Sequence, residues 1–461
     1  MDGRRTRTPR RIATIASLVA GALAGVALAG MTEAGTAQRA ESLPPPWIEA
    51  THLPPLLTAA DERVELRYDA YCFTEDDVDA PCDVDATVYA RHGSAGAFRE
   101  LPVTEERGTP EGRFVAAVPS SLARSPAGFA YYAVLRDRRT GATVTLPGGG
   151  SGAPQRSRPL VRPVEISLGA HRFGVARRAS ARVVTAPWGS SNGAVGLEHG
   201  RNPTPIGGSS FDLGADGSVH VLDEANHRVL RWRRGGVVPE EISVAINGTI
   251  ADLAVAEDGT MYVLETTAED GEPAELRAFG ARGQESAGAR LAERGAQVRV
   301  GPGNEVVVLQ HPSGQWMRVV GKGLPESRSV QRSTGRAGRP LGDAGELVVL
   351  RRADEIRVAL ADDAARTSWR ITSSTELAEV QLAERLGRRV VLVVRVFTDV
   401  EDEFRVLVLG EGGLVDAFSV AAADWAETAP LSRFRVHGSS LYQLGSTPAG
   451  LFVDRFDLEV D

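Results

Sequence analysis

The stretch SFDLGADGSVHVLDEANHRVLRW, residues 210–232, decides the fold of this chain. It consists of an apolar run, an acidic turn with glycine, a second apolar run, a polar loop and a third apolar run. Short apolar runs bounded by Gly, Asp and Asn are typical of strands joined by tight turns. The same order returns in ADLAVAEDGTMYVLETTAEDGEPAELRAFG, residues 251–280. The stretch is therefore one unit of a repeat.

Weaker copies follow, so that six units share a roughly constant period, at residues 296–320, 338–360, 377–410 and 432–458. A period of roughly 40–50 residues is typical of a β-propeller, in which each small sheet buries its faces against two neighbours. We therefore expect a six-bladed ring, although a count of five or seven remains open. The last unit shows three strands, and we expect a strand from 164–178 or 181–187 to complete it.

The first unit carries a motif. The turn Asp216-Gly217 is followed by VLDEANHRV at 221–229, which matches the pattern apolar-Asp-x-x-Asn-x-Arg-apolar at Asp223, Asn226 and Arg228. In these residues the chain resembles the NHL-repeat family of β-propeller proteins. The resemblance implies a six-bladed ring that binds proteins, nucleic acids or small ligands. Some related propellers are lyases or lactonases, so the resemblance does not decide function.

The motif residues also have a structural interpretation. Asp223 and Asn226 can bond backbone groups in a tight loop, and Arg228 can pair with Asp223 across it or with an acid of the next blade. We expect a structural role for the whole motif: Asp216, Gly217, Asp223, Asn226, His227 and Arg228. For His227 we expect a scaffold or surface position rather than a catalytic one.

The first forty residues predict export. Five arginines precede the uncharged run IATIASLVAGALAGVALAGM at 12–31, which is typical of a signal peptide or a retained membrane anchor. We expect the remaining chain to be secreted, or held at the cytoplasmic membrane by this helix with its domains outside. Cys72 and Cys82 are the only cysteines, and an oxidising compartment favours a disulfide between them.

The predicted fold class is all-β: a signal or membrane helix, a small β-sandwich and a six-bladed propeller. Six or seven short alternating strands in 59–147 are typical of an immunoglobulin or fibronectin-III sandwich. Composition sets the other boundaries: 1–40 targeting segment, 41–58 proline-rich spacer, 148–162 flexible linker and 163–461 propeller.

A long glycine-rich loop before the first complete blade, residues 186–205, is a candidate ligand site. Its candidate binding residues are Trp188, Asn192, Glu198, His199 and Arg201. The loop is expected to lie across one face of the ring, with Trp188 as a stacking platform. The alternative is a packed connection with a buried Trp.

An acidic loop, TEDDVDAPCDVDA at 74–86, is a candidate metal site. Its alternating carboxylates Asp77, Asp79, Asp83 and Asp85 suit Ca²⁺. The glycine and distal glutamate of an EF-hand loop are absent, so a solvated acidic loop is the alternative. No other cofactor is expected.

The chain favours a binding function. Its formal net charge of −8 with mixed signs argues against a general nucleic-acid binder. No nucleophile-elbow, zincin, P-loop or dinucleotide motif occurs in the sequence. We expect an exported non-catalytic protein that binds a protein, peptide, glycan or small ligand and contacts membrane only through its N-terminal segment. The alternatives are a secreted metal-assisted lyase or lactonase, marked by carboxylates and amides converging on the channel, and a structural envelope component.

Overall fold

The computed structural model is all-β. It describes residues 47–73, 83–106, 112–198, 205–246, 251–265, 275–291, 294–311, 314–319, 330–331, 338–342, 345–361, 366–426 and 432–459. No helix in these ranges is long and apolar enough to cross a membrane. The expected signal or anchor segment 1–40 lies outside them.

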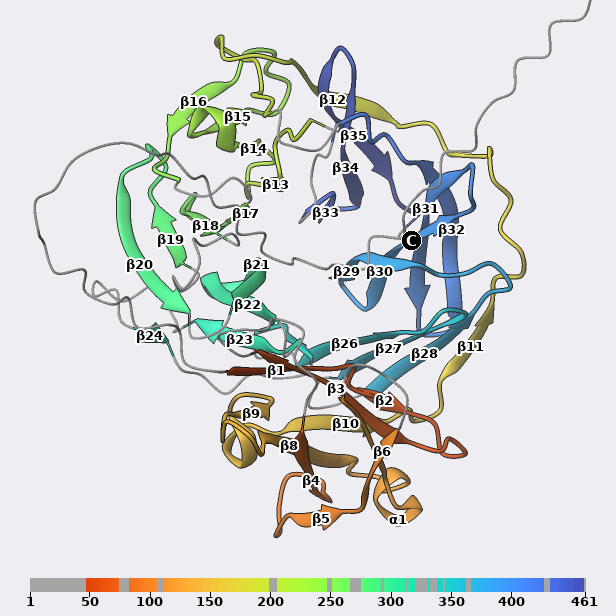
Figure 1. The fold of residues 1–461 in the computed structure, drawn as a ribbon. Coiled ribbons are helices and arrows are strands. Elements are labelled where there is room, and N and C mark those ends of the chain that lie inside the picture. Colours follow the sequence, from red (N-terminus) through yellow and green to blue (C-terminus); the bar gives the residue numbers. More distant parts are fainter. Residues whose placement is uncertain are drawn as a thin grey trace, which may run out of the picture.

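In the described part of the chain, six sheets follow one another around a ring, which is a β-propeller (Figure 1). The first three sheets are formed by β13 (Ser210–Leu213), β14 (Val219–Asp223), β15 (Arg228–Trp232) and β16 (Glu240–Ser243); by β17 (Ala251–Val255), β18 (Met261–Glu265), β19 (Glu275–Phe279), β20 (Glu285–Leu291) and β24 (Val330–Gln331); and by β21 (Arg294–Gly301), β22 (Glu305–His311) and β23 (Trp316–Val319).

The other three sheets include strands from before the first repeat unit. They are formed by β25 (Arg339–Pro340), β26 (Glu346–Arg351), β27 (Glu355–Ala361), β28 (Arg366–Thr372) and β11 (Val164–Ser167); by β29 (Glu379–Leu386), β30 (Arg389–Phe397), β31 (Asp402–Gly410) and β32 (Gly413–Ala421); and by β33 (Phe434–His437), β34 (Ser440–Thr447), β35 (Gly450–Asp457) and β12 (Ala181–Pro187).

The core of the ring lies between neighbouring sheets. β14 is buried along its whole length, and successive side chains point to opposite faces of a strand. Val221 accordingly packs in the cluster shared with the sixth sheet, whereas Leu222 packs in the cluster shared with the second. Neighbouring residues of β14 therefore belong to two different cores, one on each face of the sheet.

The ring is closed by a strand from before the first unit. β12 pairs antiparallel with β35, with Ala186 opposite Leu451. This confirms 181–187 as one of the two segments expected to complete the last unit. The other segment contributes β11, which runs parallel to β28 in the fourth sheet. Between β11 and β12 the chain follows the outside of the ring (Figure 1).

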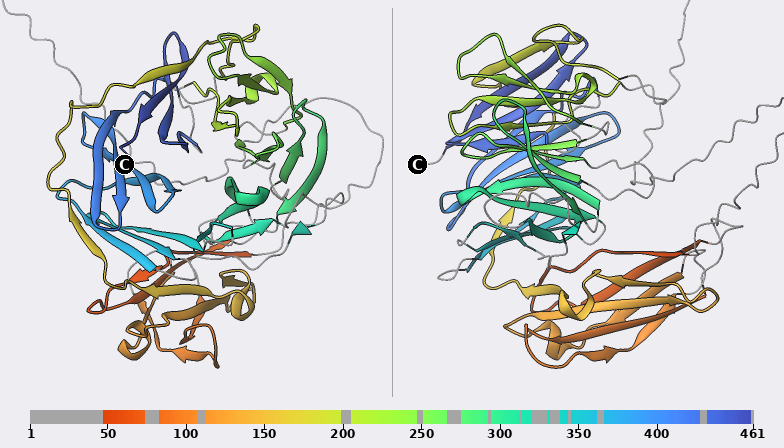
Figure 2. Two further views of the ribbon diagram at one scale, coloured as in Figure 1. Left: turned by 180° about the vertical axis from the view of Figure 1, so that it is seen from behind. Right: turned by 90° about the vertical axis from the view of Figure 1, so that its left-hand side faces the viewer.

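Two further sheets, in residues 47–159, pack face to face beside the ring (Figure 2). One sheet is formed by β1 (Trp47–His52), β3 (Glu65–Phe73), β7 (Gly112–Ala117) and β6 (Val103–Glu106); the other by β2 (Leu57–Thr58), β10 (Gln155–Pro159), β8 (Phe129–Asp137), β4 (Val84–His92), β5 (Arg99–Leu101) and β9 (Thr143–Leu146). One apolar cluster joins them, with Tyr68 and Phe114 from the first sheet and Val88 and Leu135 from the second. The described residues of this unit also include one short α-helix, α1 (Ser120–Ala123), and one 3₁₀ turn, η1 (Gly150–Gly152). The immunoglobulin or fibronectin-III assignment remains a prediction.

Two segments expected to be irregular contribute strands. Residues 155–159 of the expected linker form β10, which pairs with β8 and β2. Residues 47–52 and 57–58 of the expected spacer form β1 and β2. The prolines and glycines of these segments flank the strands, so composition alone concealed them. Cys72 in β3 is not a free thiol. Its expected partner Cys82 lies outside the described residues, and the Cys72–Cys82 bridge remains a prediction.

The two-sheet unit contacts the fourth sheet of the ring. Apolar side chains from both sides form one cluster, Leu56, Leu57, Leu160, Val348, Leu350 and Ala359. Arg357 of β27 donates to the Leu57 carbonyl oxygen at 2.9 Å and forms an ion pair with Glu62. The unit is therefore attached to the outside of the ring.

Candidate functional site

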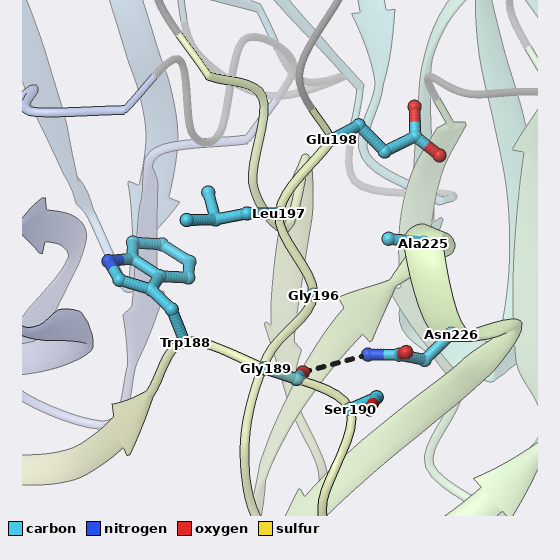
Figure 3. Close-up of a pocket in the computed structure, with 8 residues that line it drawn as sticks. All are labelled: Trp188, Gly189, Ser190, Gly196, Leu197, Glu198, Ala225 and Asn226. Carbon is cyan, nitrogen blue, oxygen red and sulfur yellow. Dashed lines mark hydrogen bonds between the residues drawn. The ribbon is translucent and has the colours of Figure 1, made fainter.

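The loop that follows β12 forms a pocket of about 440 Å³ between the sixth and first sheets (Figure 3). It is lined by Trp188, Gly189, Ser190, Gly196, Leu197, Glu198, Ala225 and Asn226. Two of the residues expected to bind a ligand, Trp188 and Glu198, thus line the same pocket. Asn192 is exposed and does not line it. His199 and Arg201 lie outside the described residues.

The repeat motif anchors this loop. One carboxylate oxygen of Asp223 accepts from the backbone N–H of Gly196 at 2.9 Å. The other accepts from Asn226 Nδ2 and from Arg228 Nε, both at 2.9 Å. The carboxylate is almost fully buried. The expected Arg228–Asp223 pair is therefore present. Asp223 also binds the loop at Gly196, which lies outside the motif.

Arg228 and Asn226 also donate hydrogen bonds to the backbone of this loop. Arg228 Nη2 donates to the carbonyl oxygens of Ala194 (2.7 Å) and Ser191 (3.2 Å). Asn226 Nδ2 donates to the Gly189 carbonyl oxygen at 3.2 Å (Figure 3). A loop with many glycines lacks side chains to pack, so these bonds to its backbone are what give the pocket a defined wall.

The remaining motif residues lie apart from the pocket. His227 is exposed in the left-handed region, with φ of 52°, where it ends a short 3₁₀ turn. In the β13–β14 turn, Asp216 accepts from the backbone N–H of Ser218 (2.9 Å) and from its hydroxyl (2.6 Å). These two bonds lower the pKa of Asp216. Gly217 has a φ of 77°, which favours glycine at this turn position.

Trp188 is half-buried at one end of the pocket. Its Nε1 donates to the Thr447 carbonyl oxygen at 2.9 Å, and its ring lies 6.0 Å from that of Trp425. In Figure 3, Trp188 and Leu197 lie on one side of the loop backbone, and Glu198 lies on the other. The pocket thus offers an indole surface on one side and a carboxylate on the other.

The channel carries a second group of polar residues, which the sequence analysis missed. The edge strand at the middle of the ring in each sheet contributes one charged side chain to what we call the channel cluster: Asp212, Asp252, Arg299, Arg339, Glu384 and Arg435. The signal was present in the sequence, as at least one charged residue inside the first strand of each unit. Recognising it required knowing that these strands meet.

Asp252 is at the centre of the channel cluster and fully buried. It accepts from Ser210 Oγ (2.7 Å) and Ser432 Oγ (2.6 Å), and its second oxygen lies 3.0 Å from Arg299 Nη1. Burial by itself raises the pKa of Asp252, but Arg299, Arg435 and the two hydroxyls outweigh it and hold the pKa below its usual value. Burial and repulsion from Arg435 lower the pKa of Arg299 to about 10.

The other channel carboxylates are paired too. Arg339 forms two hydrogen bonds with Glu384, at 2.9 and 2.8 Å. Arg435 Nε donates to Asp212 at 3.0 Å. Nearby, Glu224 is fully buried and accepts from the Ser209 N–H, and burial raises its pKa well above the usual value. The channel therefore contains paired carboxylates, and burial favours the protonated form of the neighbouring Glu224.

The expected calcium loop is described only in part. Asp77 and Asp79 lie outside the described residues. Asp83 and Asp85 both bind Arg138, with 2.8 Å between Arg138 Nη1 and Asp83 Oδ1. These two carboxylates are thus paired with a guanidinium, and the calcium site remains a prediction. Among the residues whose positions are known, no three His, Cys, Asp or Glu side chains form a metal-binding group.

Comparison with known proteins gives a fold likeness only. No family model matches the chain, and no curated protein matches it. Similar solved structures include hydrazine synthase from Kuenenia stuttgartiensis (12% identity, 57% of this chain and 89% of that one, TM-score 0.28). Virginiamycin B lyase from Staphylococcus aureus shows 10% identity over 56% and 97%, with a TM-score of 0.32. A Bacteroides thetaiotaomicron protein of unknown function shows 10% identity over 89% and 98%, with a TM-score of 0.35. The β-propeller assignment rests on the six sheets themselves.

Proposed function

We propose that this chain is an exported, non-catalytic binding protein and that the pocket beside Trp188 and Glu198 takes up its ligand. Export follows from the targeting segment expected in residues 1–40. The ligand is a peptide, a glycan or another small molecule outside the cytoplasm, because such ligands combine an apolar face with hydrogen-bond donors. The indole of Trp188 suits the apolar face, and the carboxylate of Glu198 accepts from the donors.

The observation that carries the proposal is the pairing of the channel carboxylates with arginines. A metal-assisted lyase or lactonase needs carboxylates that are free to bind a divalent cation. Asp252 instead contacts Arg299, and Glu384 contacts Arg339. A cation would have to displace a buried guanidinium from each of them, which is unfavourable because the displaced charge would be left without a partner.

A direct test uses the purified, fluorescently labelled chain on arrays of defined glycans and peptides. We expect a restricted set of array members to bind, and Glu198→Gln and Trp188→Ala to reduce that binding at least several-fold. Glu165→Gln is a matched control, because Glu165 is an exposed glutamate of β11 in the fourth sheet. Equal binding by Glu198→Gln, Trp188→Ala and the unsubstituted chain would contradict the proposed site.

The enzyme alternative is tested separately by thermal unfolding with EDTA and with added Ca²⁺, Mg²⁺ or Zn²⁺. A ligand that binds only the folded state raises the apparent stability with the logarithm of its concentration over its affinity. We expect no metal-dependent shift that requires Asp252. A shift abolished by Asp252→Asn would instead favour the metal-assisted enzyme.

A further inference from the structure

A second pocket, of about 560 Å³, lies between the fourth and fifth sheets on the outside of the ring. The segment 168–177, which lies between β11 and β12 on the outside of the ring (Figures 1 and 2), lines one wall of the pocket. This pocket shares no lining residue with the one beside Trp188. The two pockets are therefore separate.

The covering segment is fixed in place by bonds to the fifth sheet. Glu403 accepts from Gly174 N (2.7 Å) and contacts His171 Nε2 (2.8 Å). Arg177 forms two hydrogen bonds with Asp416, at 3.1 and 3.0 Å, and its guanidinium lies 3.6 Å from the centre of the Phe418 ring. The carboxylates near the pocket are thus used in holding the segment.

Two cations of the pocket lack such partners. Arg405 is half-buried, and its one hydrogen bond within the described residues is from Nη1 to Ser419 Oγ at 3.3 Å. Arg172 is exposed, and no carboxylate of the described residues lies within ion-pair distance of it or of Arg405. Burial lowers the pKa of Arg405, and the negative charges of Asp416 and Glu403 offset that effect only in part.

Much of the remaining pocket wall is apolar, and His171, Ser373 and Ser419 also line it. Leu168, Val175, Leu377 and Val396 line it, and Val175 is 71% exposed. Guanidinium groups with free donors bind carboxylates in a bidentate geometry, and a partly buried site strengthens that bond. Apolar walls beside the cations favour a ligand that is apolar over the rest of its length.

We propose that this pocket binds a small organic carboxylate with an apolar tail. The carboxylate pairs with Arg405 and Arg172, and the tail lies against Leu377 and Val396. Such a site is distinct from the pocket beside Trp188.

Isothermal titration calorimetry with three probes tests this site: octanoate, octan-1-ol and acetate. We expect octanoate to bind with one equivalent per chain. Octan-1-ol keeps the tail without the charge and should bind about 10-fold to 100-fold more weakly, the loss expected for a charge-assisted hydrogen bond. Acetate keeps the charge without the tail and should also bind much more weakly. No binding of octanoate, or equal binding of octanoate and octan-1-ol, would overturn the proposal.

Substitutions of the two arginines test whether octanoate binds in this pocket. Arg405→Gln should weaken octanoate binding about 10-fold and reduce the difference in affinity between octanoate and octan-1-ol. Arg172→Gln, on an exposed side chain that carries little folding risk, should weaken octanoate several-fold. Arg388→Gln is the matched control, because Arg388 lies in the turn before β30 of the same sheet and its side chain is 84% exposed. Unchanged octanoate binding by both Arg405→Gln and Arg172→Gln would overturn the proposal.

Discussion

The carboxylate of Asp223 accepts a 2.9 Å hydrogen bond from the backbone N–H of Gly196, 27 positions earlier in the chain. Asp223 belongs to the repeat motif of the first sheet, and Gly196 belongs to the loop that follows ring closure. The motif therefore does more than shape its own turn. It fixes the wall of the pocket that we propose as the ligand site.

Asp223→Asn should destabilise the chain. The substitution leaves the buried guanidinium of Arg228 with Glu241, 3.0 Å away, as its remaining carboxylate. Removing one partner of a buried ion pair costs about 2–5 kcal/mol, and Glu241 places the expected loss in the lower half of that range. The free energy of unfolding in urea measures this loss of stability.

Asp454→Asn is the control, because Asp454 pairs with a half-exposed Arg182 and its substitution should cost less than about 1 kcal/mol. Equal losses in the two variants would contradict the anchoring role.

Acid should weaken the channel cluster. Asp252 and Glu384 have folded-state pKa values below their usual values of 3.8 and 4.5. Groups with lowered pKa values contribute stability that is present above the unfolded values and is lost as pH falls through the folded ones. We therefore expect the free energy of unfolding to fall below about pH 4.5. Asp252→Asn should be less stable at pH 7 and show a shallower acid dependence. An unchanged slope in that variant would show that Asp252 is not responsible.

Ionisation of Glu224 should have the opposite effect and make the folded chain less stable as the pH rises. Burial raises its folded-state pKa well above the usual 4.5. Its stabilising contribution is therefore complete below pH 4.5 and is lost as pH rises toward the folded value. Glu224→Gln, which cannot ionise, should be more stable than the unsubstituted chain at pH 8 and no more stable at pH 4. Thermal unfolding at both pH values measures this difference. Parallel curves for the two proteins would contradict the buried, protonated state.

Gly450→Ala should loosen the closure of the ring. Gly450 has a φ of 155°, and an added Cβ would overlap the Ala186 carbonyl oxygen of the closing strand. Left-handed strain alone costs about 1–3 kcal/mol, and the overlap adds to it. Differential scanning calorimetry should show a lower Tm and broader unfolding. Gly412→Ala is the control, since no atom lies within 4 Å of its added Cβ. A Tm equal to that of the control would show that closure tolerates the change.

The sequence predicted some features well and others poorly. The strands of the first unit were predicted from alternation and turn residues. The Asp223–Arg228 pair and the closing segment 181–187 were each predicted as one of two alternatives. The strand β10 was not, since its composition resembles that of a linker and only pairing with β8 makes it a strand. The second pocket was also not predicted, because its arginines belong to segments that are far apart in the chain.

By itself, the sequence determined that this chain is built from repeated strand-turn-strand units, because apolar alternation and turn glycines are local properties of neighbouring residues. Only the tertiary structure decided which side chains meet. Asp252 and Ser432 are 180 positions apart, yet ring closure brings them within 2.6 Å. Arg405 interacts electrostatically with Glu403 and Asp416, but both of these carboxylates form hydrogen bonds with segment 168–177. Contacts of this kind depend on how distant segments pack, and no local pattern encodes them.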